Sequence, residues 1–104
     1  MSREVRYEII RAEDARERHC HRTEGNKVIY YSVQLEVFVE DSWKTAIRFD
    51  CAHGYAHIDR YNLVGEHLKV KLDLEFKDAL TAAEENMEQK WKFYREQFLQ
   101  GEFP

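Results

Sequence analysis

Hydrophobic and polar residues alternate along much of the chain before Asp73, which is the period of a strand with one buried face. The alternating stretches are 5–9, 28–39, 43–50, 57–61 and 68–72. Beyond Asp73 the apolar residues recur every three or four positions as far as Phe98, which is the period of an α-helix. An apolar helix stripe and an apolar sheet face bury each other, so the sequence predicts one α+β domain over residues 1–104. We expect an antiparallel meander sheet of about five strands, packed by one long C-terminal helix.

The segment 12–25 shows no clear period. Its part from Ala12 to Arg22 is so densely charged that it suits either a short solvated helix or an exposed hairpin arm. No element is therefore predicted for this segment.

The turn signal at His53-Gly54 sets the register of the strands on either side of it. A two-residue turn there, with glycine supplying a positive φ, places Arg48 opposite Asp59 and Asp50 opposite His57. Opposite charges directly across a strand pair contribute roughly 0.2–1 kcal/mol, so this register is favoured.

The preceding hairpin has to keep the apolar residues of its two strands on one face. A three-residue loop at Glu40–Ser42 does so, pairing Val39 with Trp43, Leu35 with Ile47 and Val33 with Phe49. The outer face then collects polar side chains, which are Ser32, Gln34, Glu36, Arg48, Asp50, His57, Asp59 and Tyr61.

Charge and composition narrow the class of protein. The 104 residues carry a net charge of −4 and mix acidic with basic positions, so the sequence predicts no broad nucleic-acid surface, while a local phosphate site fits it. The charged N-terminus does not resemble a signal peptide, and no apolar run is long enough to span a bilayer. The two cysteines form no motif by themselves. We expect a cytoplasmic protein with reduced thiols and no membrane contact.

The outer face of the sheet predicts an acid–base site. His57 beside Asp50 is a histidine with an orienting carboxylate, which suits a general acid or base. Arg48 would hold an anionic substrate while Asp59 positions it, a combination that suits phosphodiester cleavage, as in a small ribonuclease. The catalytic candidates are Arg48, Asp50, His53, His57 and Asp59, and the binding candidates are Tyr61, Gln34 and Glu36.

A structural interpretation of the same residues stays open. Arg48–Asp59 and Asp50–His57 would then be cross-strand pairs of an ordinary sheet face, because ion-pair networks also produce such clusters. The abundant aromatic residues would form the interface of a non-catalytic interaction module or a homo-oligomer.

Metal binding is a further alternative. The ligands would come from Cys51, His53 and His57, or from the triplet His19-Cys20-His21. Cys51 and His57 should point to opposite faces of the sheet, and the triplet has no partner at a fixed spacing. The sequence therefore predicts neither a metal nor another cofactor.

The run at 48–59, Arg-Phe-Asp-Cys-Ala-His-Gly-Tyr-Ala-His-Ile-Asp, resembles the signature of a family of small uncharacterised prokaryotic domains. That signature reads Arg-aromatic-Asp-x-Ala-His-Gly-x-x-His-x-Asp and is followed by a strand and a C-terminal helix. The segment 72–98 resembles the ending of the family, so the similarity covers about residues 28–100. The resemblance implies no reaction, but it directs attention to the five catalytic candidates.

More distantly, the chain is similar to the TumE-type toxin components of toxin–antitoxin pairs. These have a shorter Arg-aromatic-Asp-Asn-Ala run followed by histidines, and the chain departs from it at Cys51 and His53-Gly54. The resemblance implies a small toxin-like protein with a protein partner of the antitoxin kind.

Overall fold

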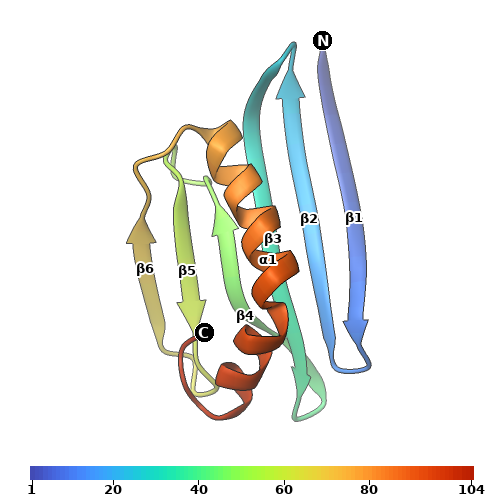
Figure 1. Ribbon diagram of the computed structural model, residues 1–104, viewed down its shortest axis with the longest axis vertical. Helices are drawn as coiled ribbons and strands as arrows, with labels where there is room; N and C mark the ends of the chain where they lie inside the picture. The colour runs from blue at the N-terminus through green and yellow to red at the C-terminus, as the bar shows by residue number, and fades with distance from the viewer.

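The computed structural model describes residues 1–104 as one sheet of six strands and one helix. The elements are β1 (Ser2–Ala12), β2 (Ala15–Glu24), β3 (Lys27–Val39), β4 (Ser42–Asp50), β5 (His57–Tyr61), β6 (His67–Lys71) and α1 (Phe76–Leu99). The strands are antiparallel neighbours in chain order, and α1 lies across β3 and β4 (Figure 1). The predicted α+β meander with a long C-terminal helix is confirmed, with one strand more than expected. No helix of the structure is both long and apolar enough to cross a membrane.

The additional strand is β2, which fills the segment where no element was predicted. Its buried inward positions are Ala15, Glu17 and His19, so two of these three carry polar side chains and hide the strand period. His19 Nε2 lies 2.9 Å from Glu17 Oε1, and Arg11 of β1 donates to the other carboxylate oxygen. Burial alone would raise the pKa of Glu17, but the bonds from His19 and Arg11 outweigh it, so the pKa is lowered. Glu17 is therefore a buried carboxylate held by its own hydrogen-bond partners.

The hydrophobic core lies between α1 and the face of the sheet that α1 covers, here called the helix face. Its largest fully buried apolar side chains are Tyr31, Phe98, Leu35, Ile47, Met87, Val33 and Val37. Two ion pairs tie the helix to the first hairpin: Arg11 Nη2 lies 2.7 Å from Glu88, and Arg95 Nη2 lies 2.7 Å from Asp14. The opposite face, here called the open face, is therefore left without a covering layer.

The turn between β3 and β4 differs from the predicted three-residue loop. Val39 pairs with Ser42, which leaves a two-residue turn at Glu40 and Asp41, both with positive φ (53° and 64°). A bulge at Ala46 then shifts the register by one residue. The predicted Val39–Trp43 pair is therefore wrong, whereas the pairs Leu35–Ile47 and Val33–Phe49 are confirmed. The bulge restores the apolar face that the longer loop was expected to preserve.

Residues with positive φ at both turn positions make this turn a target for stabilisation. Type I′ turns favour Asn-Gly, because a left-handed conformation costs other residues about 1 kcal/mol or more. We expect the double variant Glu40→Asn/Asp41→Gly to raise the free energy of unfolding by about 1 kcal/mol in urea titrations. Asp41→Ala should lower it, and equal stability of all three proteins would contradict the left-handed turn.

The link between β4 and β5 is longer than the predicted two-residue turn, although the register is as expected. Arg48 pairs with Asp59 and Asp50 pairs with His57. Pairing stops there, and residues 51–56 form a loop in which the N–H of Gly54 donates to the carbonyl of Cys51 at 3.0 Å. Only Gly54, with φ of 85°, is left-handed in this loop. The strands separate here because Cys51 turns into the core while His57 lies on the open face.

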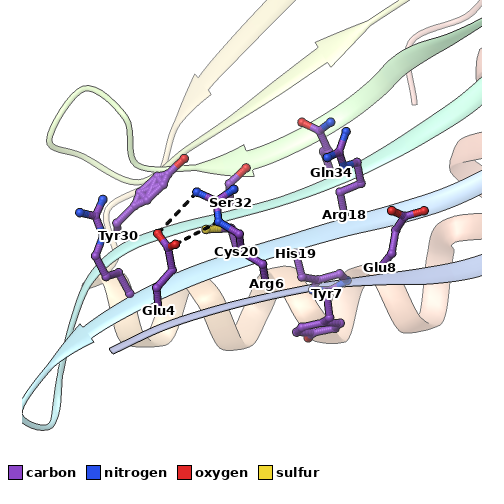
Figure 2. Close-up of a pocket in the computed structure, with 11 residues that line it drawn as sticks. Glu4, Arg6, Tyr7, Glu8, Arg18, His19, Cys20, Tyr30, Ser32 and Gln34 are labelled. Atoms are coloured by element: carbon purple, nitrogen blue, oxygen red, sulfur yellow. Dashed lines mark hydrogen bonds and ion pairs between the residues drawn. The ribbon is translucent and has the colours of Figure 1, made fainter. Parts of the chain in front are cut away.

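The open face carries a shallow hollow of about 510 Å³ over β1, β2 and β3 (Figure 2). Its charged lining residues are Glu4, Arg6, Glu8, Arg18 and Arg22. Ser32 and Gln34 form the border of the hollow on β3, and they pair with Asp50 and Arg48 of β4. The hollow therefore adjoins the predicted site directly.

Candidate functional site

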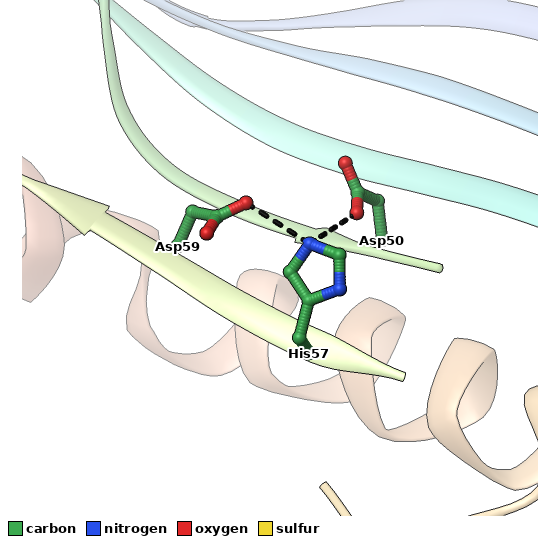
Figure 3. A group of neighbouring side chains, drawn as sticks. All are labelled: Asp50, His57 and Asp59. Carbon is green, nitrogen blue, oxygen red and sulfur yellow. Dashed lines mark hydrogen bonds and ion pairs between the residues drawn. The ribbon is translucent and has the colours of Figure 1, made fainter. Parts of the chain in front are cut away.

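Three buried side chains converge on the open face where β4 and β5 meet. Asp50, His57 and Asp59 are 5%, 1% and 4% exposed, and each offers a ligand atom within 4.8 Å of the other two. His57 Nε2 lies 2.6 Å from Asp50 Oδ1 and 3.1 Å from Asp59 Oδ2 (Figure 3). The register predicted from the sequence brings two of these residues together, and the third lies two positions further along β5. We call this cluster the Asp-His-Asp triad.

Both ring nitrogens of His57 face acceptors. Nδ1 lies 3.2 Å from the backbone carbonyl oxygen of Tyr55, while Nε2 faces the two carboxylates. A neutral imidazole has one N–H, and a bare Nε2 lone pair between two carboxylates is repulsive. Without a metal ion, the N–H therefore lies on Nε2 and donates to the carboxylates, whereas a metal ion at Nε2 would leave the N–H on Nδ1 to donate to Tyr55. The triad leaves no nitrogen of His57 free to exchange a proton with a substrate.

The carboxylates of the triad are themselves held by neighbours. The backbone N–H of Ala52 donates to Asp50 Oδ1 at 3.3 Å. On the other side, His67 Nε2 lies 2.8 Å from Asp59 Oδ1 and Lys69 Nζ lies 3.9 Å from the same oxygen. Asp59 thus contacts His57 through Oδ2, and His67 and Lys69 of β6 through Oδ1. Such outer partners orient the ligands of a metal site and fix the tautomer of a ligating histidine.

Arg48 is not bound to Asp59 as the sequence predicted. The two residues are directly opposite, but the Arg48 Nε donates to Gln34 Oε1 at 2.8 Å, and Arg48 forms no ion pair. Gln34 in turn donates to Glu36, which is buried and accepts from Arg16 at 2.6 Å. Both oxygens of Asp59 contact His57, His67 and Lys69 instead, which explains why Asp59 does not bind Arg48. Gln34 therefore positions Arg48, whose charge stays uncompensated beside the triad.

The remaining candidates lie around the triad. His53 is exposed in the loop, with its ring stacked 5.7 Å from that of His57. Tyr61 is half-buried and stacks on His67 with the ring centres 4.6 Å apart. Burial raises the pKa of Tyr61, and the nearby charge of Arg48 opposes that rise. Tyr61 therefore lies close to both Arg48 and the carboxylates.

The hollow and the triad are joined through Tyr30. Burial raises the pKa of Tyr30, and the charge of Asp50 raises it further. Tyr30 lies two residues before Ser32, which pairs with Asp50. Tyr30 also lines the hollow, where the guanidinium of Arg22 lies 5.4 Å from its ring centre. Arg18, with its side chain 56% exposed, has Glu36 as its nearest carboxylate, at 3.9 Å. The hollow thus places the positive charges of Arg18 and Arg22 next to the Asp-His-Asp triad.

The other metal sets considered from the sequence are separated in space. Cys51 belongs to the core, where burial raises the pKa of its thiol and Tyr31 N–H lies 3.4 Å from its sulfur. His57 lies on the open face, so the two do not share a site, as expected. Within the triplet, His19 is bound to Glu17 on the helix face while Cys20 lines the hollow on the open face.

Sequence reasoning missed His67, Lys69 and the carbonyl of Tyr55. The signal was present for the first two, because a hairpin at Val64-Gly65 brings β6 beside β5 and pairs Asp59 with Lys69 and Tyr61 with His67. The role of Tyr55 depends on the shape of the loop and has no sequence signal. The convergence of Asp59 with Asp50 and His57 was missed because Asp59 was assigned to Arg48.

The comparisons place the chain in a family without giving it an activity. The chain belongs to the family described as "Domain of unknown function (DUF7718)", whose model matches residues 1–104. It matches no curated protein and no solved structure. The resemblance to toxin components therefore stays a prediction, and any function has to be argued from the site itself.

Proposed function

We propose that the open face is a metal-dependent site for phosphodiester cleavage. The Asp-His-Asp triad binds one divalent ion of the first transition row, Arg48 binds a phosphate, and the hollow holds the rest of the substrate. The observation that carries the proposal is the convergence of two buried carboxylates on the same nitrogen of His57, at 2.6 and 3.1 Å.

The charge of the triad suits a divalent ion. Asp50 and Asp59 are buried carboxylates, and Lys69 Nζ, 3.9 Å from Asp59 Oδ1, is the only lysine or arginine in ion-pair contact with them. With a divalent ion, two carboxylates and a neutral imidazole balance the charge. Ligand atoms held about 2.0–2.2 Å from such an ion lie roughly 3–4 Å apart, so the 3.1 Å separation of Nε2 from Asp59 fits, whereas Asp50 Oδ1, at 2.6 Å, would have to move outward. Mixed carboxylate and imidazole ligands suit Mn²⁺, Fe²⁺ and Zn²⁺.

The ligand number suits catalysis. Asp50, His57 and Asp59 would hold the ion with three protein ligands, one fewer than a closed structural site has, and the ion would supply Lewis-acid activation of a water. In the overall hydrolysis, the water oxygen would bond to phosphorus, the bond from phosphorus to the leaving oxygen would break, and the leaving oxygen would take the proton lost by the water. Arg48 compensates the charge on the phosphate oxygens, because it has no carboxylate partner of its own.

The low exposure of the triad supports a second candidate. Without a metal ion, Asp50, His57 and Asp59 form a structural hydrogen-bonded cluster, and the domain acts as a non-catalytic interaction module. A ribonuclease-like reaction in which His57 exchanges protons with the substrate is disfavoured, because both of its nitrogens are engaged. The two candidates differ in whether the triad binds metal.

Hydrolysis of bis-p-nitrophenyl phosphate and of a labelled single-stranded RNA tests the proposal. We expect activity in chelator-treated protein only after Mn²⁺ or Zn²⁺ is added, and a loss of more than about 100-fold in Asp59→Asn. Arg48→Gln should raise KM about tenfold, because a charge-assisted bond to phosphate is lost. His53→Ala, which removes an exposed neighbouring histidine, serves as the control. Activity that is indifferent to chelation and to Asp59→Asn would contradict the proposal.

A further inference from the structure

The strand β1 is a long free edge of the sheet. It pairs only with β2, and nothing covers its other side (Figure 1). Free edges offer unpaired N–H and C=O groups to another strand, and proteins usually protect them by proline, bulges or shortness. The eleven residues of β1 contain no proline, and the only irregularity lies at its end, between Ile10 and Ala12. The opposite edge, β6, has five residues and carries Lys69 and Lys71, which is a protected edge.

A second copy of β1 is the partner that fits this edge. In a strand already paired on one side, every second residue directs its N–H and C=O outward. Residues with outward N–H and C=O groups must face each other across the new strand pair. Two copies related by a two-fold axis therefore pair only in registers in which one residue of β1 faces its own copy at the axis. The axis then selects which side chains face each other.

The register centred on Tyr7 is complementary at the two positions on either side of the axis. Tyr7 is the midpoint of β1, so this register pairs the whole strand. Arg6 then faces Glu8 of the partner subunit on the open face, and this pair occurs twice. Val5 faces the partner subunit's Ile9 on the helix face, also twice. Opposite-charge and apolar cross-strand pairs both stabilise a sheet. Further out, Glu4 faces the partner subunit's Ile10, and Arg3 faces the partner subunit's Arg11, whose charge is balanced within its own chain by Glu17 and Glu88.

The neighbouring registers are poorer. Centring on Arg6 sets two arginines against each other and Glu4 against Glu8 of the partner subunit. Centring on Glu8 opposes two glutamates. Centring on Val5 pairs Glu4 with the partner subunit's Arg6, but it leaves the end of the strand from Ile9 to Ala12 unpaired. The present partner of Arg6 is Glu4 at 3.0 Å, with side chains 71% and 43% exposed, and such an exposed pair is easily exchanged.

We infer that two copies of this chain associate through β1 in the register centred on Tyr7, forming one continuous sheet. Both helices then lie on the same side of the sheet, and the two open faces form one surface. The hollow is lined on β1 by Glu4, Arg6 and Glu8, so the hollows of the two copies adjoin across the two-fold axis. The inference stands on the edge strand alone and does not depend on the proposed activity.

Charge reversal along β1 tests the register. Sedimentation velocity of the wild type should show dimers at about 100 μM protein, as for a micromolar dissociation constant. Arg6→Glu and Glu8→Arg should each weaken the dimer about tenfold or more, because each sets two like-charge pairs across the axis. The double variant Arg6→Glu/Glu8→Arg should restore the wild-type dimer. Lys90→Glu, an equal charge change on the exposed surface of α1, should leave it unchanged.

Each contrary result overturns the inference. A wild type that stays monomeric throughout would exclude the interface. A double variant that is no better than the single ones would exclude the Arg6–Glu8 pairing. Weakening by Glu4→Arg, but not by Glu8→Arg, would assign the dimer to the register centred on Val5 instead. Circular dichroism of each variant separates loss of association from loss of folding.

Discussion

Replacing His57 with alanine in metal-free protein is expected to lower the free energy of unfolding by about 3–5 kcal/mol. The ring is 1% exposed and lies between Asp50 and Asp59, so its removal leaves two buried carboxylates facing each other without the nitrogen that both of them contact. The free energy is measured by urea unfolding in the presence of a chelator.

The matched control for this variant is His53→Ala. His53 stacks on the ring of His57, but it is exposed and forms no hydrogen bond through its side chain. Its loss should change the free energy of unfolding by less than about 0.5 kcal/mol, as for an ordinary surface position. A loss below about 1 kcal/mol for His57→Ala would show that the ring does not hold the carboxylates together.

The second large effect is stabilisation by metal. An ion that binds the folded chain alone raises the free energy of unfolding by about 2.7 kcal/mol at one hundred times its dissociation constant. For a domain of this size the midpoint of thermal unfolding should rise by roughly 10–20 °C. We expect this shift for wild-type protein with Mn²⁺, measured by differential scanning calorimetry against chelator-treated protein.

Two aspartate variants separate the triad from general binding of cations to acidic groups. Asp59→Asn should abolish the stabilisation by Mn²⁺, whereas Asp73→Asn, an exposed aspartate elsewhere in the chain, should keep it. The same shift in both variants would assign the effect to surface carboxylates. No shift in the wild type would favour a triad held by hydrogen bonds alone.

The arrangement of the site follows from the sequence as far as strand register determines it. The pairing of Asp50 with His57, and of Arg48 with Asp59, could be predicted because a strand has a period of two and a slip would bury polar side chains. The loop length could not be predicted in the same way. A six-residue loop and a two-residue turn give the same register, and only the loop supplies the Tyr55 carbonyl that fixes His57.

Sequence patterns fail where polar groups are buried in compensated networks. β2 could not be recognised because its inward positions include Glu17 and His19, which are satisfied by Arg11 on the neighbouring strand. The same cause explains why Asp59 binds His57 and His67 rather than Arg48. Several partners lie within reach of that carboxylate, and side-chain geometry decides among them.

The fold also explains why the triad lies on the face without a helix. α1 covers β3 and β4 on one side, so every second residue of β4 and β5 is directed away from the core. Asp50, His57 and Asp59 take these outward positions but are enclosed by their neighbours on β6 and in the loop. The triad is thus supported by the sheet, with His53 and His67 exposed and Tyr61 half-buried around it.

The most direct test of the metal proposal is a crystal structure of the protein grown with Mn²⁺ and measured at a wavelength that gives anomalous scattering from manganese. Our account predicts one peak about 2.0–2.3 Å from His57 Nε2 and from an oxygen of both Asp50 and Asp59, with Nδ1 hydrogen-bonded to the carbonyl of Tyr55. Short direct contacts between His57 and the two carboxylates, with manganese bound only elsewhere or not at all, would contradict it.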